Sequence, residues 1–102
     1  MAHISSNDAD LMTQQVHIPE HVAVRRFDEE CVALNLKSGQ YFGLNGVAAR
    51  MFERLGEIDT ASEAIGPLAE EYGQDHAVIE RDLAALIRDL AERGLVELGP
   101  AD

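Results

Sequence analysis

The sequence predicts one α+β domain, in which a three-stranded antiparallel sheet is followed by three helices. Apolar residues recur at about every second position between residues 21 and 44, and then at helical spacing from residue 47 to residue 90. A length of 102 residues with 46% hydrophobic residues allows one core but not two. We expect the domain to span residues 21–98, between a flexible N-terminal tail at 1–20 and a C-terminal tail at 99–102.

The first 20 residues show no hydrophobic period, because their apolar residues are scattered among Ser, Asn, Asp and Gln. They also lack the basic start and apolar stretch of a signal peptide. The chain has no apolar run near the roughly 20 residues of a membrane span, and its lone cysteine cannot form an internal disulfide. These features predict a reduced, cytoplasmic protein without a membrane partner.

Three short strands come first. Val22 and Val24 mark a strand at residues 21–27, and a polar turn separates it from the apolar run 31–36. Gly39 can adopt positive φ in the next turn, and residues 40–44 continue as the third strand. Sequential strand order leaves this third strand at a sheet edge, unless the C-terminal segment 95–98 covers it.

Three helices follow. The first lies between Asn45, a candidate N-cap, and Gly56. The second begins at a capping box over residues 60–63, and Pro67 must kink it or divide it into two pieces. The third starts after Asp75 and has the strongest apolar stripe, which must be buried.

Residues suited to catalysis or metal binding do not form a recognisable set. The sequence has no phosphate-binding loop, no nucleophile elbow and no dinucleotide motif. His17 and His21 stand four apart, but the proline between them makes a helical metal site improbable. Cys31 heads an apolar strand without a neighbouring base, and the many carboxylates fit solvated turns and helix faces. We therefore expect no catalytic residues, no metal and no cofactor.

The charge balance disfavours nucleic acid as a partner. The chain has 8 Lys and Arg against 19 Asp and Glu, a formal net charge of -11. Strands followed by helices also suggest a winged-helix transcriptional regulator, which is the alternative function. However, acidic neighbours match Arg81, Arg88 and Arg93 along the last helix, so no cationic face forms to contact phosphates.

Two aromatic residues, Tyr41 and Phe42, stand together on the predicted edge strand of a chain with only 5% aromatic residues. Both could be core residues on opposite faces of the sheet. Alternatively, the exposed edge could offer unpaired backbone groups to an incoming extended peptide. An exposed edge can also pair with a second copy of the chain and so form a homodimer.

Residues 31–45, an apolar strand followed by G-x-Y-x-x-L-N, resemble the PqqD-like family, as do residues 68–73 and 90–96. The resemblance covers roughly residues 20–98. It implies a winged-helix-like, non-catalytic peptide-binding domain that recognises the leader of a ribosomally made, post-translationally modified peptide. Such a domain presents the precursor to modifying enzymes or to a leader peptidase. The tyrosine in the third strand and the free-standing size look closer to recognition proteins of lasso-type pathways than to the chaperone of quinone-cofactor synthesis, and the sequence leaves both pathways open.

The resemblance also implies where the leader binds. In that family the leader adds as an antiparallel strand to the third strand, beside the last helix. The implied peptide-binding residues are Gln40, Tyr41, Phe42, Gly43 and Leu44 on the strand and Val78, Arg81, Asp82, Ala85, Leu86 and Asp89 on the helix. A third hypothesis is a small subunit that only scaffolds a larger enzyme, which would not bind a short peptide on its own.

Overall fold

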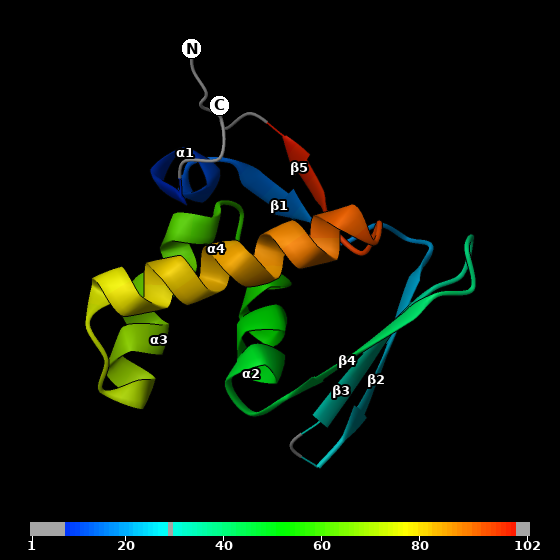
Figure 1. Cartoon of the computed structure of the whole chain (residues 1–102), viewed down its shortest axis with the longest axis horizontal. Helices are drawn as coiled ribbons and strands as arrows, with labels where there is room; N and C mark the ends of the chain where they lie inside the picture. Colours follow the sequence, from blue (N-terminus) through cyan, green and yellow to red (C-terminus); the bar gives the residue numbers. More distant parts are fainter. Residues whose placement is uncertain (1–7, 29, 100–102) are drawn as a thin grey trace.

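The computed structural model describes residues 8–28 and 30–99, and it confirms the predicted α+β class (Figure 1). Three strands form an antiparallel sheet in the order β2-β3-β4: β2 (Val22–Phe27), β3 (Glu30–Asn35) and β4 (Tyr41–Asn45). The third strand thus begins one residue later than the predicted range 40–44. Figure 1 shows the helices gathered on one side of this sheet.

The helical layer follows the predicted order. It consists of α2 (Gly46–Leu55), the 3-10 helix η1 (Ala61–Ala64), α3 (Ile65–Tyr72) and α4 (His76–Glu92). The capping box at Thr60 is present, and its backbone N–H donates to the Glu63 carboxylate at 3.4 Å. Pro67 lies in the first turn of α3, where its missing N–H has no helical acceptor to lose. The predicted division into two helical pieces is therefore confirmed.

The expectation of a flexible tail over residues 1–20 is wrong for the part that the structure describes. Residues 8–20 include a short helix, α1 (Asp8–Met12), and a strand, β1 (Gln15–His17). Leu11, Met12 and Val16 are buried in the core. A single helical turn and a three-residue strand are too short to display a hydrophobic period, so the sequence pattern conceals them. Residues 1–7 lie outside the described residues.

The C-terminal segment completes a second, two-stranded sheet. Strand β5 (Glu97–Gly99) pairs antiparallel with β1, so that Gly99 faces Gln15. Gly99 is thereby part of the fold rather than of the predicted tail 99–102, whose last three residues are outside the described range. Because β5 pairs with β1, it does not cover β4. Within the described residues, β4 pairs only with β3.

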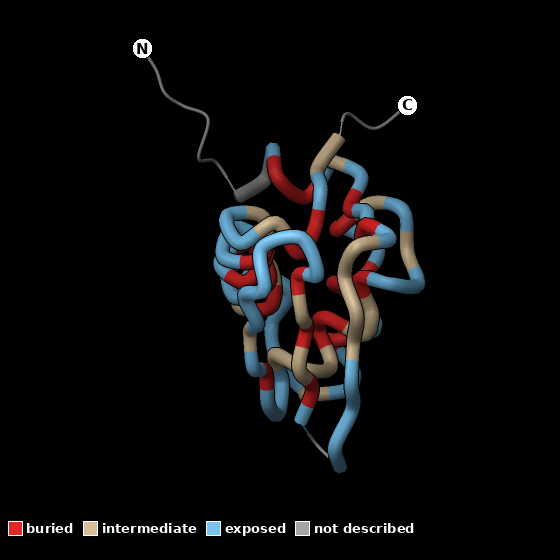
Figure 2. Tube along the Cα trace, turned by 90° about the vertical axis from the view of Figure 1, so that its right-hand side faces the viewer, coloured by how far each residue is buried: buried red, intermediate tan, exposed pale blue. Residues whose placement is uncertain are grey.

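Helix α4 contributes a large share of the core, and Figure 2 shows the buried stretches of the chain toward the interior of the molecule. The largest fully buried side chains of α4 are Ile79, Leu83, Ile87 and Leu90. No described helix is long and apolar enough to cross a membrane. The C-terminal end of α4 is fixed by Asn35, a buried polar residue at the end of β3.

Asn35 joins three parts of the chain. Its side-chain nitrogen donates to the Arg93 carbonyl oxygen at 3.1 Å, and its side-chain oxygen accepts the backbone N–H groups of Lys37 and Ser38 at 2.9 and 3.2 Å. A Cβ at Gly94 would lie 2.8 Å from the Asn35 nitrogen, and Gly94 has φ 72°. Glycine at position 94 thus lets α4 end close against β3.

Candidate functional site

The free edge of β4 offers main-chain hydrogen-bonding groups. The Gln40 carbonyl accepts the Asn35 N–H at 2.8 Å, so Gln40 directs its oxygen toward β3. Directions alternate along an antiparallel strand, which turns the N–H and C=O groups of Tyr41 and Gly43 away from β3. No described strand lies on that side. The structure thus fixes which residues point outward, a parity that the sequence left undetermined.

The side chains of β4 alternate between the two faces of the sheet. Phe42 and Leu44 share the inner face with their partners Ala33 and Cys31, and Leu44 is buried. Tyr41 lies on the outer face and is 71% exposed. The interpretation of both aromatic residues as core is therefore wrong for Tyr41, because the helices cover only the inner face (Figure 1).

Phe42 connects β4 to the end of α4. The guanidinium carbon of Arg93 stands 4.5 Å from the centroid of the Phe42 ring, within the range of a cation–π contact. Sequence reasoning assigned Arg93 only to a charge-matched helix face. Arg93 lies beside Phe42, 51 residues earlier in the chain, because Asn35 holds the end of the helix near the sheet. The sequence pattern gives no signal for this contact.

The six helix residues implied by the resemblance divide into two groups. Five are accessible: Val78 is half-buried, while Arg81, Asp82, Ala85 and Asp89 are exposed. Leu86 is only 9% exposed and packs in the core, so the expectation that it lies on the accessible surface of the helix is wrong. Arg81 and Asp82 pair with each other, with Nε and Oδ1 3.4 Å apart.

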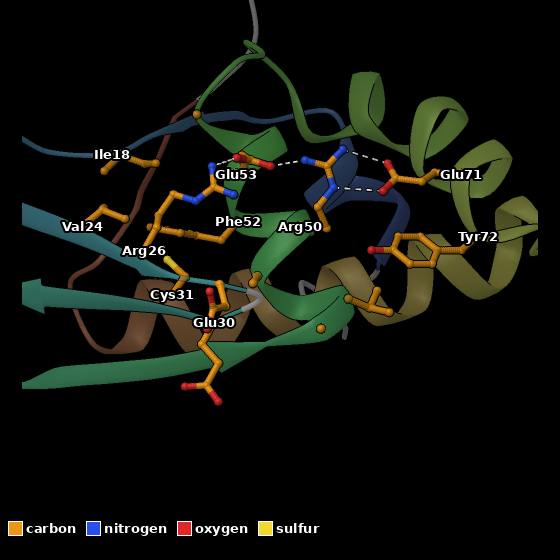
Figure 3. Close-up of a pocket in the computed structure, with 15 residues that line it drawn as sticks. Ile18, Val24, Arg26, Glu30, Cys31, Arg50, Phe52, Glu53, Glu71 and Tyr72 are labelled. Atoms are coloured by element: carbon orange, nitrogen blue, oxygen red, sulfur yellow. Dashed lines mark hydrogen bonds and ion pairs between the residues drawn. The ribbon is translucent and has the colours of Figure 1, made fainter.

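A cavity of about 460 Å³ lies elsewhere, between the inner face at β2, helix α2 and helix α3 (Figure 3). Its apolar wall includes Val24, Cys31 and Phe52, and none of its lining residues belongs to β4 or α4. Burial raises the pKa of the Cys31 thiol, although nearby Arg26 acts in the opposite direction. The thiol therefore stays protonated near neutral pH and is a poor nucleophile.

A chain of ion pairs crosses one side of this cavity (Figure 3). Arg26 of β2 pairs with Glu53, and Glu53 pairs with Arg50, both on α2. Arg50 binds Glu71 of α3 through two hydrogen bonds of 2.9 Å, which lower the pKa of Glu71 and raise that of Arg50. These charges join the sheet to two helices, and the lowered pKa keeps the Glu71 carboxylate ionised. Among the described residues, no three His, Cys, Asp or Glu side chains gather as metal ligands would.

Comparison with known proteins identifies relatives of the whole domain. Residues 30–96 match the family model of coenzyme PQQ synthesis protein D (PqqD). A structure of TbiB1 in complex with the TbiA(beta) leader peptide is 37% identical and has a TM-score of 0.76, covering 84% of this chain and 99% of that one. A lasso peptide synthetase B1 complexed with the leader peptide is 30% identical, with a TM-score of 0.73 and coverages of 81% and 98%. No curated protein matches the chain.

Proposed function

Since the chain belongs to the PqqD family, we propose that it binds the leader segment of a ribosomally made precursor peptide and presents the precursor to a modifying enzyme or a leader peptidase. The open edge of β4 carries this proposal, because Tyr41 and Gly43 direct their main-chain groups away from the sheet. The two solved relatives, both bound to leader peptides, support it. The lasso peptide synthetase relative favours a lasso-type pathway.

In this mechanism the leader extends the sheet as an antiparallel strand. Main-chain hydrogen bonds to Tyr41 and Gly43 supply affinity that does not depend on the leader's sequence. Leader side chains opposite Phe42 and Leu44 point to the inner face, beside α4, and a few apolar ones act as anchors. The accessible helix residues form the rim of the site: Val78, Arg81, Asp82, Ala85 and Asp89. The Arg81–Asp82 pair would help to fix the leader's register.

The same proposal assigns the protein no reaction of its own. Glu53 and Glu71 are engaged in ion pairs, and the Cys31 thiol is held protonated by burial. Turnover would therefore belong to the partner enzyme. We place the protein in the cytoplasm, where a ribosomally made precursor is available to it.

The winged-helix regulator is not favoured by the charges of this fold. The net charge is -11, and the exposed Arg81 is paired with Asp82 on α4. A DNA-reading helix needs cations that neutralise phosphates, so α4 would approach DNA against net repulsion.

Peptide binding can be tested on the purified chain by isothermal titration with overlapping synthetic peptides that tile a lasso-type precursor peptide. We expect saturable binding by peptides from the leader half alone, and no mass change in the peptide after incubation. Binding confined to the modified half, or cleavage by this protein alone, contradicts the proposal. The absence of binding by any peptide would favour the scaffolding hypothesis.

The same edge can join two copies of the chain in the absence of a leader. Pairing β4 with β4 uses the outward groups of Tyr41 and Gly43, so a dimer and a leader complex exclude each other. Light scattering after size exclusion should show any dimer dissociate when the leader peptide is added. A dimer that persists with peptide bound is held by another surface.

A further inference from the structure

The outer face of the sheet has an apolar surface next to the open edge. Tyr41 is 71% exposed and Phe27 is 56% exposed; half-buried Leu34 is the partner of Tyr41, and half-buried Val32 lies between the two aromatic residues on the same face. The register pairs Leu34 with Tyr41 and Val32 with Gly43. The apolar surface therefore extends to β4 itself, where an added strand would lie.

Gly43 leaves a notch in this surface. An ideal Cβ at Gly43 has no heavy atom within 4 Å, and Gly43 is not among the described glycines with positive φ. Neither crowding nor backbone conformation thus requires glycine at this position. Glycine weakens a strand interior and often marks a place where a ligand approaches closely. The space at Gly43 is open, and the register makes Val32 its cross-strand neighbour and Tyr41 the preceding residue on the same face.

We propose that the leader is recognised on both faces of the β4 edge, and that its residue opposite Gly43 carries a large apolar or aromatic side chain that fills this notch. The inference rests on the proposed strand addition. Leader residues that pair with the outward groups of Tyr41 and Gly43 place their side chains on the same, outer face. The side chain opposite Gly43 then crosses the glycine to contact Val32 and Tyr41.

We assign the notch to the leader because Gly43 belongs to β4, the strand to which the leader is proposed to add. The row Arg25–Val32–Gly43 runs across the three strands, and an added strand supplies its next member. An aromatic or large apolar residue beside a strand glycine replaces the cross-strand contacts that the glycine cannot make. The proposed leader therefore carries two anchor residues. One side chain points to the inner face of the sheet and the other to the outer face.

The test is a yeast-displayed library of random 12-residue peptides, sorted on the purified full chain. We expect enriched sequences with large apolar residues at two positions whose sequence numbers differ by an odd number, because such side chains point to opposite faces of the added strand. Gly43→Val fills the notch and should weaken these peptides about tenfold, while Gly43→Ser should bind like the wild type. Sorting on Gly43→Val should select small residues at the outer-face position.

Two further variants separate this inference from the proposed function. Gly43→Pro removes the outward N–H, and peptides that still bind it in the folded state overturn strand addition and the notch together. If Gly43→Pro abolishes binding but Gly43→Val does not, strand addition stands and the notch is overturned. Tyr41→Ala removes an exposed ring and should weaken the binding only of peptides with a large side chain on the outer face. Phe27→Ala removes an exposed ring on β2, away from the edge, and serves as the control.

Other outcomes also decide the matter. Enrichment at positions of a single parity overturns the outer-face anchor, and a library without any binder overturns both proposals. Self-association of the free chain that Gly43→Val abolishes would place Tyr41 of a second copy in the notch instead of a leader residue. Thermal melting of each variant shows that binding is compared between folded proteins.

Discussion

The regions beside β2 and along β4 differ in whether their polar groups have hydrogen-bonding or ion-pair partners. Beside β2, the cavity of about 460 Å³ is crossed by ion pairs in which Arg26, Glu53, Arg50 and Glu71 satisfy one another. Along β4, main-chain groups of Tyr41 and Gly43 face no described strand. The charged groups beside the cavity are thus already paired with one another, whereas main-chain groups along β4 have no strand partner within the described residues, which is why we propose the edge as the site of recognition.

A proline scan of β4 gives the largest expected contrast. Gly43→Pro and Tyr41→Pro remove outward N–H groups that the sheet does not use, so both proteins should fold and fail to bind the leader. Phe42→Pro removes a group that faces β3 and should destabilise the fold. Circular dichroism and titration measure the two effects. Leader binding that survives both outward substitutions would place the leader away from β4.

Substitution of Asn35 tests whether this side chain anchors the C-terminal end of α4 against β3. Asn35→Ala leaves buried groups at the α4 end and the β3 turn without a partner, which should reduce the free energy of unfolding by about 1–3 kcal/mol. Asn45→Ala is the matched control, because Asn45 is exposed and its side chain makes no cap hydrogen bond. Chemical denaturation compares them, and equal stabilities would show that Asn35 does not anchor the helix.

Tyr41 distinguishes recognition from packing. Tyr41→Ala should weaken leader binding by more than about 1 kcal/mol and leave the melting temperature nearly unchanged, because the ring is 71% exposed. Titration and thermal melting measure both quantities. An unchanged affinity in the folded variant would remove Tyr41 from the site.

The ion pairs beside β2 should have the smallest effect, confined to stability in acid. The pKa of Glu71 is lowered in the folded protein, so its ion pair with Arg50 stabilises the fold above the ordinary glutamate pKa of 4.5. That contribution is lost as the pH falls through the lowered value. Glu71→Gln should therefore flatten the acid limb of the stability curve without changing leader affinity at pH 7. A large loss of affinity would connect the cavity to recognition.

Periodicity in the sequence was sufficient to predict the sheet, its order and the helices, including the break at Pro67. It did not reveal α1 and β1, whose burial depends on α4 and β5 rather than on a repeat of their own. The edge strand was predicted, and the apolar stripe of α4 includes Leu86, which is buried although the resemblance implied a place in the binding surface. The sequence left open whether Tyr41 is exposed, and this exposure and the contact of Arg93 with Phe42 depend on tertiary packing that no local pattern encodes.

Backbone amide exchange, measured residue by residue by NMR with and without the leader peptide, tests strand addition most directly. The amides of Tyr41 and Gly43 should exchange rapidly in the free protein and become strongly protected in the complex, while those of Phe42 and Leu44 are protected in both states. The amides that line the β2 cavity should not change. Protection confined to the cavity, with Tyr41 and Gly43 still exchanging freely, would contradict the account.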